Sequence, residues 1–511
     1  MQHTTDKHFH DEEKPWAEHV ETASRASEQV GEEDALARRV KRPARELTQK
    51  EEDAMYRKVD WHLMPTVAIL YLLSFMDRGN IGNARLYGLE AELGMSSADY
   101  NIALSCFFIT YCFCEVPANI ILKRTRPAYW IGGITVAWGI VMTCMGVVQN
   151  FGGLLATRLM LGVAEAGLFP GIVLILSLYY PRHKSQARVA FFFGAATLAG
   201  AFSGLLAYGI GFMDGVANYA AWRWIFILEG IATVVWGVVT VFILPPFPQD
   251  VKWLKPHEKE WLLYRKASDG SSVGEAEHVS KKYVMQAFTD IKTWLGIGYY
   301  FGVVTPLYAI SLFAPTLINA FGTYSRPQVQ LLTVPIYVAA FIFVMGTSIW
   351  ADKRKSRYPF VMLDLILCLL GHVINITPAP NGVKYFGLFL IAMGAYGGLP
   401  STVTWLTNNL SGQAKRGVGS AAQIGLGNLA ALASSNVYRT QDKPEYYLGH
   451  GVVLGFVAIG FICAPLNAWY LSRENARKER ELALPESERP KYTIQELRDL
   501  GDRAVEFRYT I

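Results

Sequence analysis

Twelve long apolar segments recur along the 511-residue chain and constrain its fold more than any other feature. Each is long enough to cross the roughly 30 Å hydrocarbon core of a bilayer as a helix. A soluble α/β enzyme would not carry a dozen such segments with its charged residues concentrated in the connections between them. The sequence therefore predicts an all-α membrane protein with twelve transmembrane helices. The segments lie near residues 61–82, 100–122, 128–148, 152–178, 189–211, 222–245, 291–318, 329–350, 359–377, 383–405, 417–438 and 449–471.

A polar stretch over residues 246–290 divides these segments six and six. Two six-helix halves joined by a linker are typical of transporters whose halves rock about a central site near the midplane. We therefore expect five parts: a tail, two six-helix halves separated by a linker, and a second tail. Their boundaries are 1–60, 61–245, 246–290, 291–472 and 473–511.

The basic residues of the short loops predict the orientation. One side carries about twelve Lys and Arg, in KRTR, PRHKSQAR, DKRKSR and AKR, and the other about five, namely Arg85, Arg326, Lys384, Arg439 and Lys443. Because the richer side is usually cytoplasmic, both tails and the linker are expected in the cytosol. The first tail has no signal peptide and is expected to be a largely disordered arm.

Composition argues against several other classes of protein. All six cysteines fall in expected spans, which argues against a disulfide framework or a metal site. The ten histidines show no pairs at helical spacing in the spans, so a di-metal oxidase lacks its ligands. The net charge of +5 follows membrane topology, so no nucleic-acid partner is expected. No nucleophile, phosphate loop or cofactor site is apparent, and we predict no enzyme activity and no cofactor.

Two charges lie inside the fourth segment, in RLMLGVAEAGLFPG. Arg158 and Glu165 are seven residues apart, so a helix would place them on one face about 10.5 Å apart along its axis. Charges at this depth usually line a cavity or meet a partner helix. We interpret Arg158 as an anion-binding group and Glu165 as a protonatable carboxylate, the alternative being a buried ion pair that joins helices. Gly171 after Pro170 is expected to let this helix bend.

Five stretches carry a family resemblance: LSFMDRGNIGNA (73–84), FFITYCFCEVPANIILKR (107–124), RLMLGVAEAGLFPG (158–171), WRWIFILEG (222–230) and WLTNNLSGQAKRGVG (405–419). With them the chain resembles the major facilitator superfamily, and within it the anion:cation symporter family, especially fungal allantoate and nicotinate permeases. The likeness extends from Asp60 to Arg473. It implies twelve helices, alternating access, and import of a small organic anion together with protons. We expect a monomer whose partners are that anion, protons and the bilayer.

The resemblance adds candidate residues. Arg78 matches an arginine of animal organic-anion relatives and is a second candidate for the substrate carboxylate; alternatively it snorkels or pairs with Asp77. Glu229, in the sixth segment, is a second candidate for proton coupling, with a structural role as its alternative.

The second half has almost no charge at mid-depth, so its candidates are uncharged. Tyr308, Tyr396 and Asn428 are the residues chosen for substrate contact, from a group that also holds Trp405, Asn408 and Gln423. The first half is therefore expected to hold the anion and the proton, and the second half to shape specificity.

The loop motif of the superfamily is altered in the first half. Asn119, Lys123 and Arg124 stand where glycine, aspartate and arginine are usual, whereas the second half keeps Asp352. The resemblance therefore implies that Asp352 holds the cytoplasmic gate, with Glu115 supplying the first-half charge.

Two alternatives to import remain open from the sequence. One is export of an organic acid or secondary metabolite, and the other is a nutrient sensor that keeps the fold without transporting. The branch that the chain resembles implies the plasma membrane, and the vacuole is the alternative. The sequence does not identify the anion.

Overall fold

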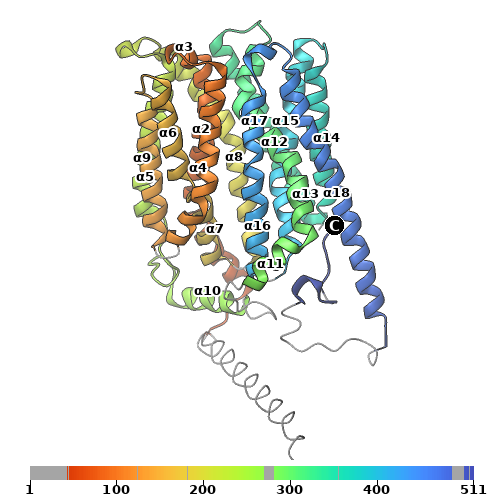
Figure 1. The fold of residues 1–511 in the computed structure, drawn as a ribbon. Helices are drawn as coiled ribbons and strands as arrows, with labels where there is room; N and C mark the ends of the chain where they lie inside the picture. Colours follow the sequence, from red (N-terminus) through yellow and green to blue (C-terminus); the bar gives the residue numbers. More distant parts are fainter. Residues whose placement is uncertain are drawn as a thin grey trace, which may run out of the picture.

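The computed structural model describes residues 43, 45–122, 125–180, 182–269, 281–354, 356–411, 413–485, 500–505 and 507–511. All regular structure in these residues is helical. Figure 1 shows a bundle of long, nearly parallel helices. Among the described residues, ten helices are long and apolar enough to cross a membrane, counting α6 and α7 as one. The fold class expected from the sequence is confirmed.

Each of the twelve expected segments is helical. The first half contains α2 (Gln49–Leu86), α4 (Ser97–Leu122), α5 (Pro127–Met145), α6 (Phe151–Glu165), α7 (Leu168–Tyr179), α8 (Arg182–Ile210) and α9 (Ala221–Ile243). The second contains α12 (Ile291–Asn319), α13 (Arg326–Arg354), α14 (Tyr358–Ile376), α15 (Asn381–Asn408), α16 (Gln413–Asn428), α17 (Ala430–Val437) and α18 (Tyr447–Leu482). Short helix α3 (Leu89–Glu92) and four 3₁₀ turns lie in connections and in the second tail.

Two expected spans are interrupted. The fourth is split into α6 and α7 at Ala166–Gly167, rather than bending at Gly171. Pro170 explains the position: its ring clashes with the carbonyl four residues earlier, which belongs to Ala166, and it has no N–H to donate. The eleventh span is split into α16 and α17 around Leu429.

Helical structure also occurs outside the expected spans. Helix α2 begins at Gln49, where Thr48 and Glu51 form a reciprocal capping box. The linker holds α10 (Pro256–Asp269) and α11 (Lys281–Thr289). Lys58 of α2 forms an ion pair with Glu258 of α10 at 2.6 Å, which connects the linker to the start of the first half.

We call the end of the bundle near α10 and α11, drawn at the bottom of Figure 1, the basic end, and the opposite end the far end. The two halves are hydrogen-bonded at the far end. Asn436 donates its amide to Ser105 Oγ at 2.7 Å, and the Ser105 and Ser435 hydroxyls are 3.1 Å apart. These bonds join α4 to α17 and close the far end in this conformation.

Glycines bring α2 and α12 into close contact between the halves. A Cβ placed on Gly82 would lie only 2.4 Å from the carbonyl oxygen of Leu312. Small residues allow helices in lipid to approach in this way. Helices α2 and α12 therefore pack against each other at the centre of the bundle, where their side chains can reach a shared site.

Candidate functional site

An ion pair lies inside the first half, between α2 and the end of α6. Arg78 donates Nε–H to Glu165 Oε1 at 2.8 Å, and the Ser74 hydroxyl donates to the same oxygen. Glu165 is fully buried and Arg78 is 8% exposed. Pairing offsets part of the high cost of burying these two charges. The pair therefore places a cation and a carboxylate in direct contact inside the first half.

Aromatic rings enclose the Arg78 guanidinium. Its Cζ lies 4.7 Å from the ring centroid of Tyr111, 5.2 Å from that of Phe75 and 5.6 Å from that of Phe107. Ring faces attract cations within about 6 Å. These rings come from α2 and α4, so the two helices together form an aromatic box around one charge.

The second half completes this site with uncharged groups. Tyr308 of α12 donates its hydroxyl to Asn428 Oδ1 of α16 at 3.0 Å. The Tyr308 ring packs edge-on against Phe108 of α4, with centroids 4.9 Å apart, and its hydroxyl interacts with Arg78. The structure thus brings together Arg78, Glu165, Tyr308 and Asn428, which the sequence places far apart.

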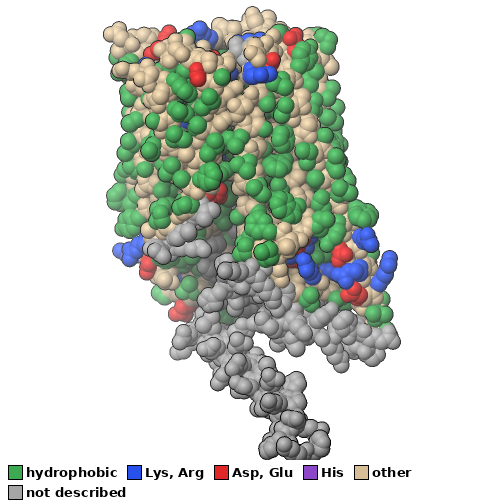
Figure 2. All heavy atoms as spheres, in the orientation of Figure 1, with side chains coloured by type: hydrophobic (Ala, Val, Ile, Leu, Met, Phe, Trp, Pro, Cys, Tyr) green, Lys and Arg blue, Asp and Glu red, His purple; other side chains and the backbone are tan. Residues whose placement is uncertain are grey.

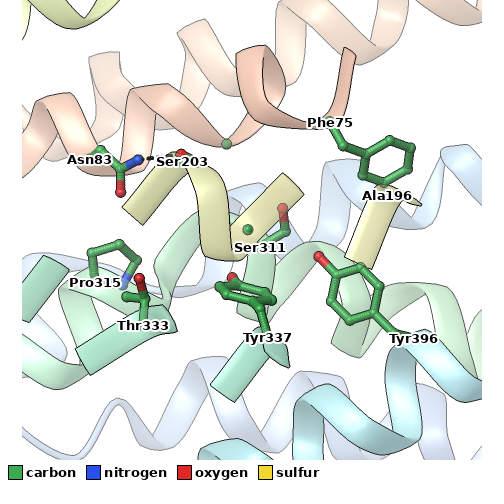
Figure 3. A pocket seen from close by; sticks show the side chains of 11 residues that line it. Phe75, Asn83, Ala196, Ser203, Ser311, Pro315, Thr333, Tyr337 and Tyr396 are labelled. Atoms are coloured by element: carbon green, nitrogen blue, oxygen red, sulfur yellow. Dashed lines mark hydrogen bonds between the residues drawn. The ribbon is translucent and has the colours of Figure 1, made fainter. Parts of the chain in front are cut away.

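Tyr396 lies in a neighbouring cavity. Figure 3 shows Asn83 and Ser203 on one side of a small space and Tyr337 and Tyr396 on the other, with Phe75 at its edge. The cavity volume is about 20 Å³, room for one water molecule. Phe75, which lines this cavity, also contacts the Arg78 guanidinium. Tyr396 is therefore adjacent to the site but does not share its charge.

Arg158 is not the ion-pair partner of Glu165 in this conformation. Its side chain is 1% exposed, and among the described residues nothing hydrogen-bonds its Nε or Nη2. Glu165 Oε2 and Asp77 Oδ1 are likewise unbonded within the described chain, and Arg158 interacts electrostatically with both carboxylates. Arg158 therefore provides a second cation close to Glu165, while Arg78 makes the direct contact.

Asp77 belongs to a polar network that we did not single out from the sequence. It is fully buried and accepts from Trp138 Nε1 at 2.6 Å and from Thr233 Oγ1 at 3.3 Å. Because consecutive helical residues point about 100° apart, Asp77 faces α5 and α9 while Arg78 faces α6. The alternative that Arg78 pairs with its neighbour Asp77 is therefore wrong in this conformation.

Glu229 belongs to a second set of buried hydrogen bonds. The Asn80 amide donates to Glu229 Oε2, Ser203 donates to Asn80 Oδ1 at 2.9 Å, and Asn83 donates to Ser203 Oγ at 2.6 Å. A chain of hydrogen bonds thus connects Glu229 to the small cavity shown in Figure 3. Applying the rule for intramembrane charges to Asp77, as we did to Arg158, would have marked Asp77 as a buried candidate from the sequence.

The expected gate residues are not members of the Arg78–Glu165 ion pair. Glu115 of α4 is partly exposed and interacts electrostatically with Arg78. Asp352, 55% exposed at the end of α13, forms an ion pair with Arg357 of the same half. Lys123 and Arg124 of the altered motif lie outside the described residues. A gating role for Glu115 or Asp352 therefore stays a prediction.

The fold also joins two histidines that the sequence separates. His372 of α14 and His450 of α18 are buried, with their Nδ1 atoms 2.8 Å apart. Over the described part of the chain, no three His, Cys, Asp or Glu side chains converge as metal ligands would. The pair thus links α14 to α18 by a hydrogen bond.

Known transporters resemble this chain along most of its length. The MFS-type transporter cnsO of Penicillium expansum is 36% identical over 475 residues, which cover 89% of this chain and 90% of cnsO. The high-affinity nicotinic acid transporter of Saccharomyces cerevisiae is 29% identical over 84% of this chain and 79% of its own.

Solved structures share the fold at low sequence identity. A bacterial homologue of the human lysosomal transporter Spinster has a TM-score of 0.60 and 14% identity, covering 80% of this chain and 95% of that one. The proton:xylose symporter XylE gives the same TM-score, identity and coverage. The family model described as Major Facilitator Superfamily matches residues 67–435 of this sequence. This protein, a multi-pass membrane protein of the secondary-transporter kind, therefore belongs to the major facilitator superfamily.

Proposed function

We propose that this protein imports a small organic anion by proton symport, as a member of the anion:cation symporter family. The observation that carries the proposal is the buried Arg78–Glu165 ion pair inside an aromatic box. A guanidinium binds a carboxylate through two parallel hydrogen bonds, and here one carboxylate already occupies it. A substrate carboxylate must therefore compete with Glu165 for Arg78.

Protonation would decide this competition. When Glu165 takes up a proton, its attraction to Arg78 falls and the guanidinium becomes available to the substrate anion. When Glu165 loses the proton, its carboxylate reclaims Arg78 and favours release. Binding the anion and the proton together thus avoids leaving an unpaired charge in the buried site. Ser74 supports the exchange, because its hydroxyl can donate to either form of Glu165.

The surrounding side chains favour a compact carboxylate with a planar or polar body. Phe107, Tyr111 and Tyr308 offer ring faces and hydroxyls, and Asn428 offers an amide beside them. Nicotinate fits this description, and one relative is a nicotinic acid transporter. Allantoate and pantothenate are the other anions to compare. We place the protein in the plasma membrane with its basic end in the cytosol, so the conformation described here is closed to the outside.

Uptake of radiolabelled nicotinate at acidic external pH, with allantoate and pantothenate as competitors, tests the substrate class. Arg78→Lys should reduce affinity at least tenfold, because an ammonium cannot form the paired hydrogen bonds. The matched control is Arg223→Lys, which alters another buried arginine–carboxylate pair, with Glu92 at 2.8 Å. Equal loss of uptake in both variants at equal surface expression would show that Arg78 has only a structural role.

Glu165→Gln tests the coupling. The amide mimics the protonated carboxyl, so substrate exchange across the membrane should survive while accumulation driven by a proton gradient fails. A structural Glu165 predicts instead that exchange, accumulation and folding decline together, because removing one partner of a buried pair costs about 3–5 kcal/mol. Accumulation at the wild-type level would move the coupling role to Glu229 or Glu115. Export in place of uptake by the unaltered protein would overturn the proposed direction.

A further inference from the structure

A second site lies at the basic end of the bundle, away from the Arg78–Glu165 pair. There residues 501–505 and 507–511 pack against the ends of α12, α15 and α18. Trp405 Nε1 of α15 donates to the Thr510 carbonyl at 3.0 Å, and Lys478 of α18 donates to the carbonyls of Asp502 and Phe507 at 2.6 and 3.0 Å. This segment, which we call the C-terminal strap, is therefore a fixed part of the fold.

A buried charge cluster anchors the strap. Asp502 is fully buried, and its carboxylate forms ion pairs with Lys292 of α12 and, at 2.8 Å, with Lys415 of α16. Burial alone would raise the pKa of Asp502, but the two lysine charges outweigh it and lower the pKa to about 2. The carboxylate therefore stays ionised at any physiological pH, and the strap stays attached.

The strap forms one wall of a cavity of about 210 Å³. This volume is about ten times that of the small cavity shown in Figure 3. Three cationic side chains from three segments line it: Lys292 of α12, Arg477 of α18 and Arg503 of the strap. The Tyr470 and Tyr509 rings and residues 289–291 at the start of α12 form much of the rest.

Two carboxylates also line the cavity, and both are engaged. Asp290 accepts from Lys415 at 2.6 Å, and Glu474 accepts from Arg477 at 3.0 Å. Arg503 is exposed, and no described residue is hydrogen-bonded to its guanidinium. The lining thus keeps a net positive charge, with at least one guanidinium available to a ligand.

The cavity lies at the depth of the lipid headgroups. Ile291, which lines it, is 50% exposed, Trp294 one turn further along α12 is 52% exposed, and Trp469 beside Tyr470 is 59% exposed. Exposed tryptophans mark the membrane–water interface. Figure 2 shows Lys and Arg side chains gathered below the hydrophobic band, where Figure 1 shows α18 leaving the bundle. These exposed side chains indicate that the cavity lies near the membrane–water interface.

From this geometry we propose that the cavity between α12, α18 and the C-terminal strap binds the phosphate headgroup of an anionic phospholipid. The acyl chains would lie along the exposed apolar surface of Ile291 and Trp294, and the headgroup would contact the exposed Arg503 and the partly exposed Tyr470. Basic pockets between transmembrane helices bind anionic headgroups in this way. The bound lipid would hold the strap against the second half.

The test uses the full-length protein in nanodiscs of phosphatidylcholine with or without phosphatidylinositol, and native mass spectrometry counts the lipid that stays bound. Phosphatidylinositol should be retained and should raise the unfolding temperature. Arg503→Gln should weaken retention about fivefold, since each basic residue near an anionic surface contributes about 1 kcal/mol. Arg503→Lys should restore most of it.

The matched control is Arg508→Gln, which removes the same charge from the same strap at an exposed residue paired with Glu479 outside the cavity. Equal effects of the two variants, or no preference for phosphatidylinositol over phosphatidylcholine, would overturn the proposal. Inorganic phosphate added to pure phosphatidylcholine nanodiscs separates the possible sources: equal stabilisation by phosphate alone would assign the site to a soluble phosphate compound and refute the lipid. None of these outcomes depends on the transported substrate.

Discussion

Gly82→Ala should shift the protein away from the conformation described here. A methyl group on Gly82 would lie 2.4 Å from the Leu312 carbonyl oxygen, whereas real Cβ atoms essentially never approach closer than 3.0 Å. The neighbour is backbone, so α2 and α12 must separate by at least the difference, about 0.6 Å. Overpacking of this kind costs about 1–3 kcal/mol. Because the contact joins the two halves, most of that cost should fall on the state that is closed at the far end.

The cost of overpacking sets the size of the expected shift between the two conformations. A destabilisation of about 2 kcal/mol would change the ratio of closed to open far ends about thirtyfold. The assay is the rate at which an impermeant thiol reagent labels a cysteine placed at Ser435, which hydrogen-bonds across the far end in the closed state. Labelling should be faster in Gly82→Ala, and transport should fall because the closed state is reached less often.

Gly79 gives a matched control one turn earlier on α2. Its added methyl group would meet only Ser311 of α12, at an ordinary distance of 3.6 Å from the backbone oxygen. In Gly79→Ala, the cysteine at position 435 should therefore be labelled at the same rate as in the parent, and substrate transport should be unchanged. If Gly82→Ala also matched the parent in both assays, the close contact between α2 and α12 would not control the far end, and the reasoning would be refuted.

Three further predictions concern the strap, the site and the topology. Asp502→Asn should destabilise the protein by about 3–5 kcal/mol, measured as a lower unfolding temperature, because it leaves Lys292 and Lys415 buried with one carboxylate fewer. The pKa of Asp502 is about 2 in the folded protein and 3.8 ordinarily. Its contribution to the stability of the folded protein should therefore be complete above about pH 4 and lost as the pH falls towards 2. If the stability of Asp502→Asn kept the parent's full pH dependence in an acid titration, this prediction would be contradicted. Asn428→Ala should change which anions compete for uptake while accumulation remains proton-driven, and an unchanged competition profile would remove Asn428 from the site. A cysteine at Lys384 should be labelled from outside intact cells; labelling only after permeabilisation would reverse the proposed topology.

The fold class could be predicted from the sequence because it depends on local properties. A segment of about 20 apolar residues has one stable solution in lipid, a helix that pairs its own backbone groups, whatever its neighbours are. The same reasoning placed Arg158 and Glu165 in the buried interior, since a charge facing lipid is costly. It could not say which cation meets which carboxylate, because that depends on how helices rotate against one another.

The tertiary structure decided those pairings. Seven-residue spacing suggested that Arg158 and Glu165 act together, yet the break at Ala166–Gly167 ends α6 at Glu165, whose carboxylate meets Arg78 on α2. Likewise, Asp502 lies more than two hundred residues from Lys292 and in a tail that the sequence marks as polar. Such contacts depend on the packing of distant segments, which a single sequence does not record, whereas helix formation in a membrane depends on each segment alone.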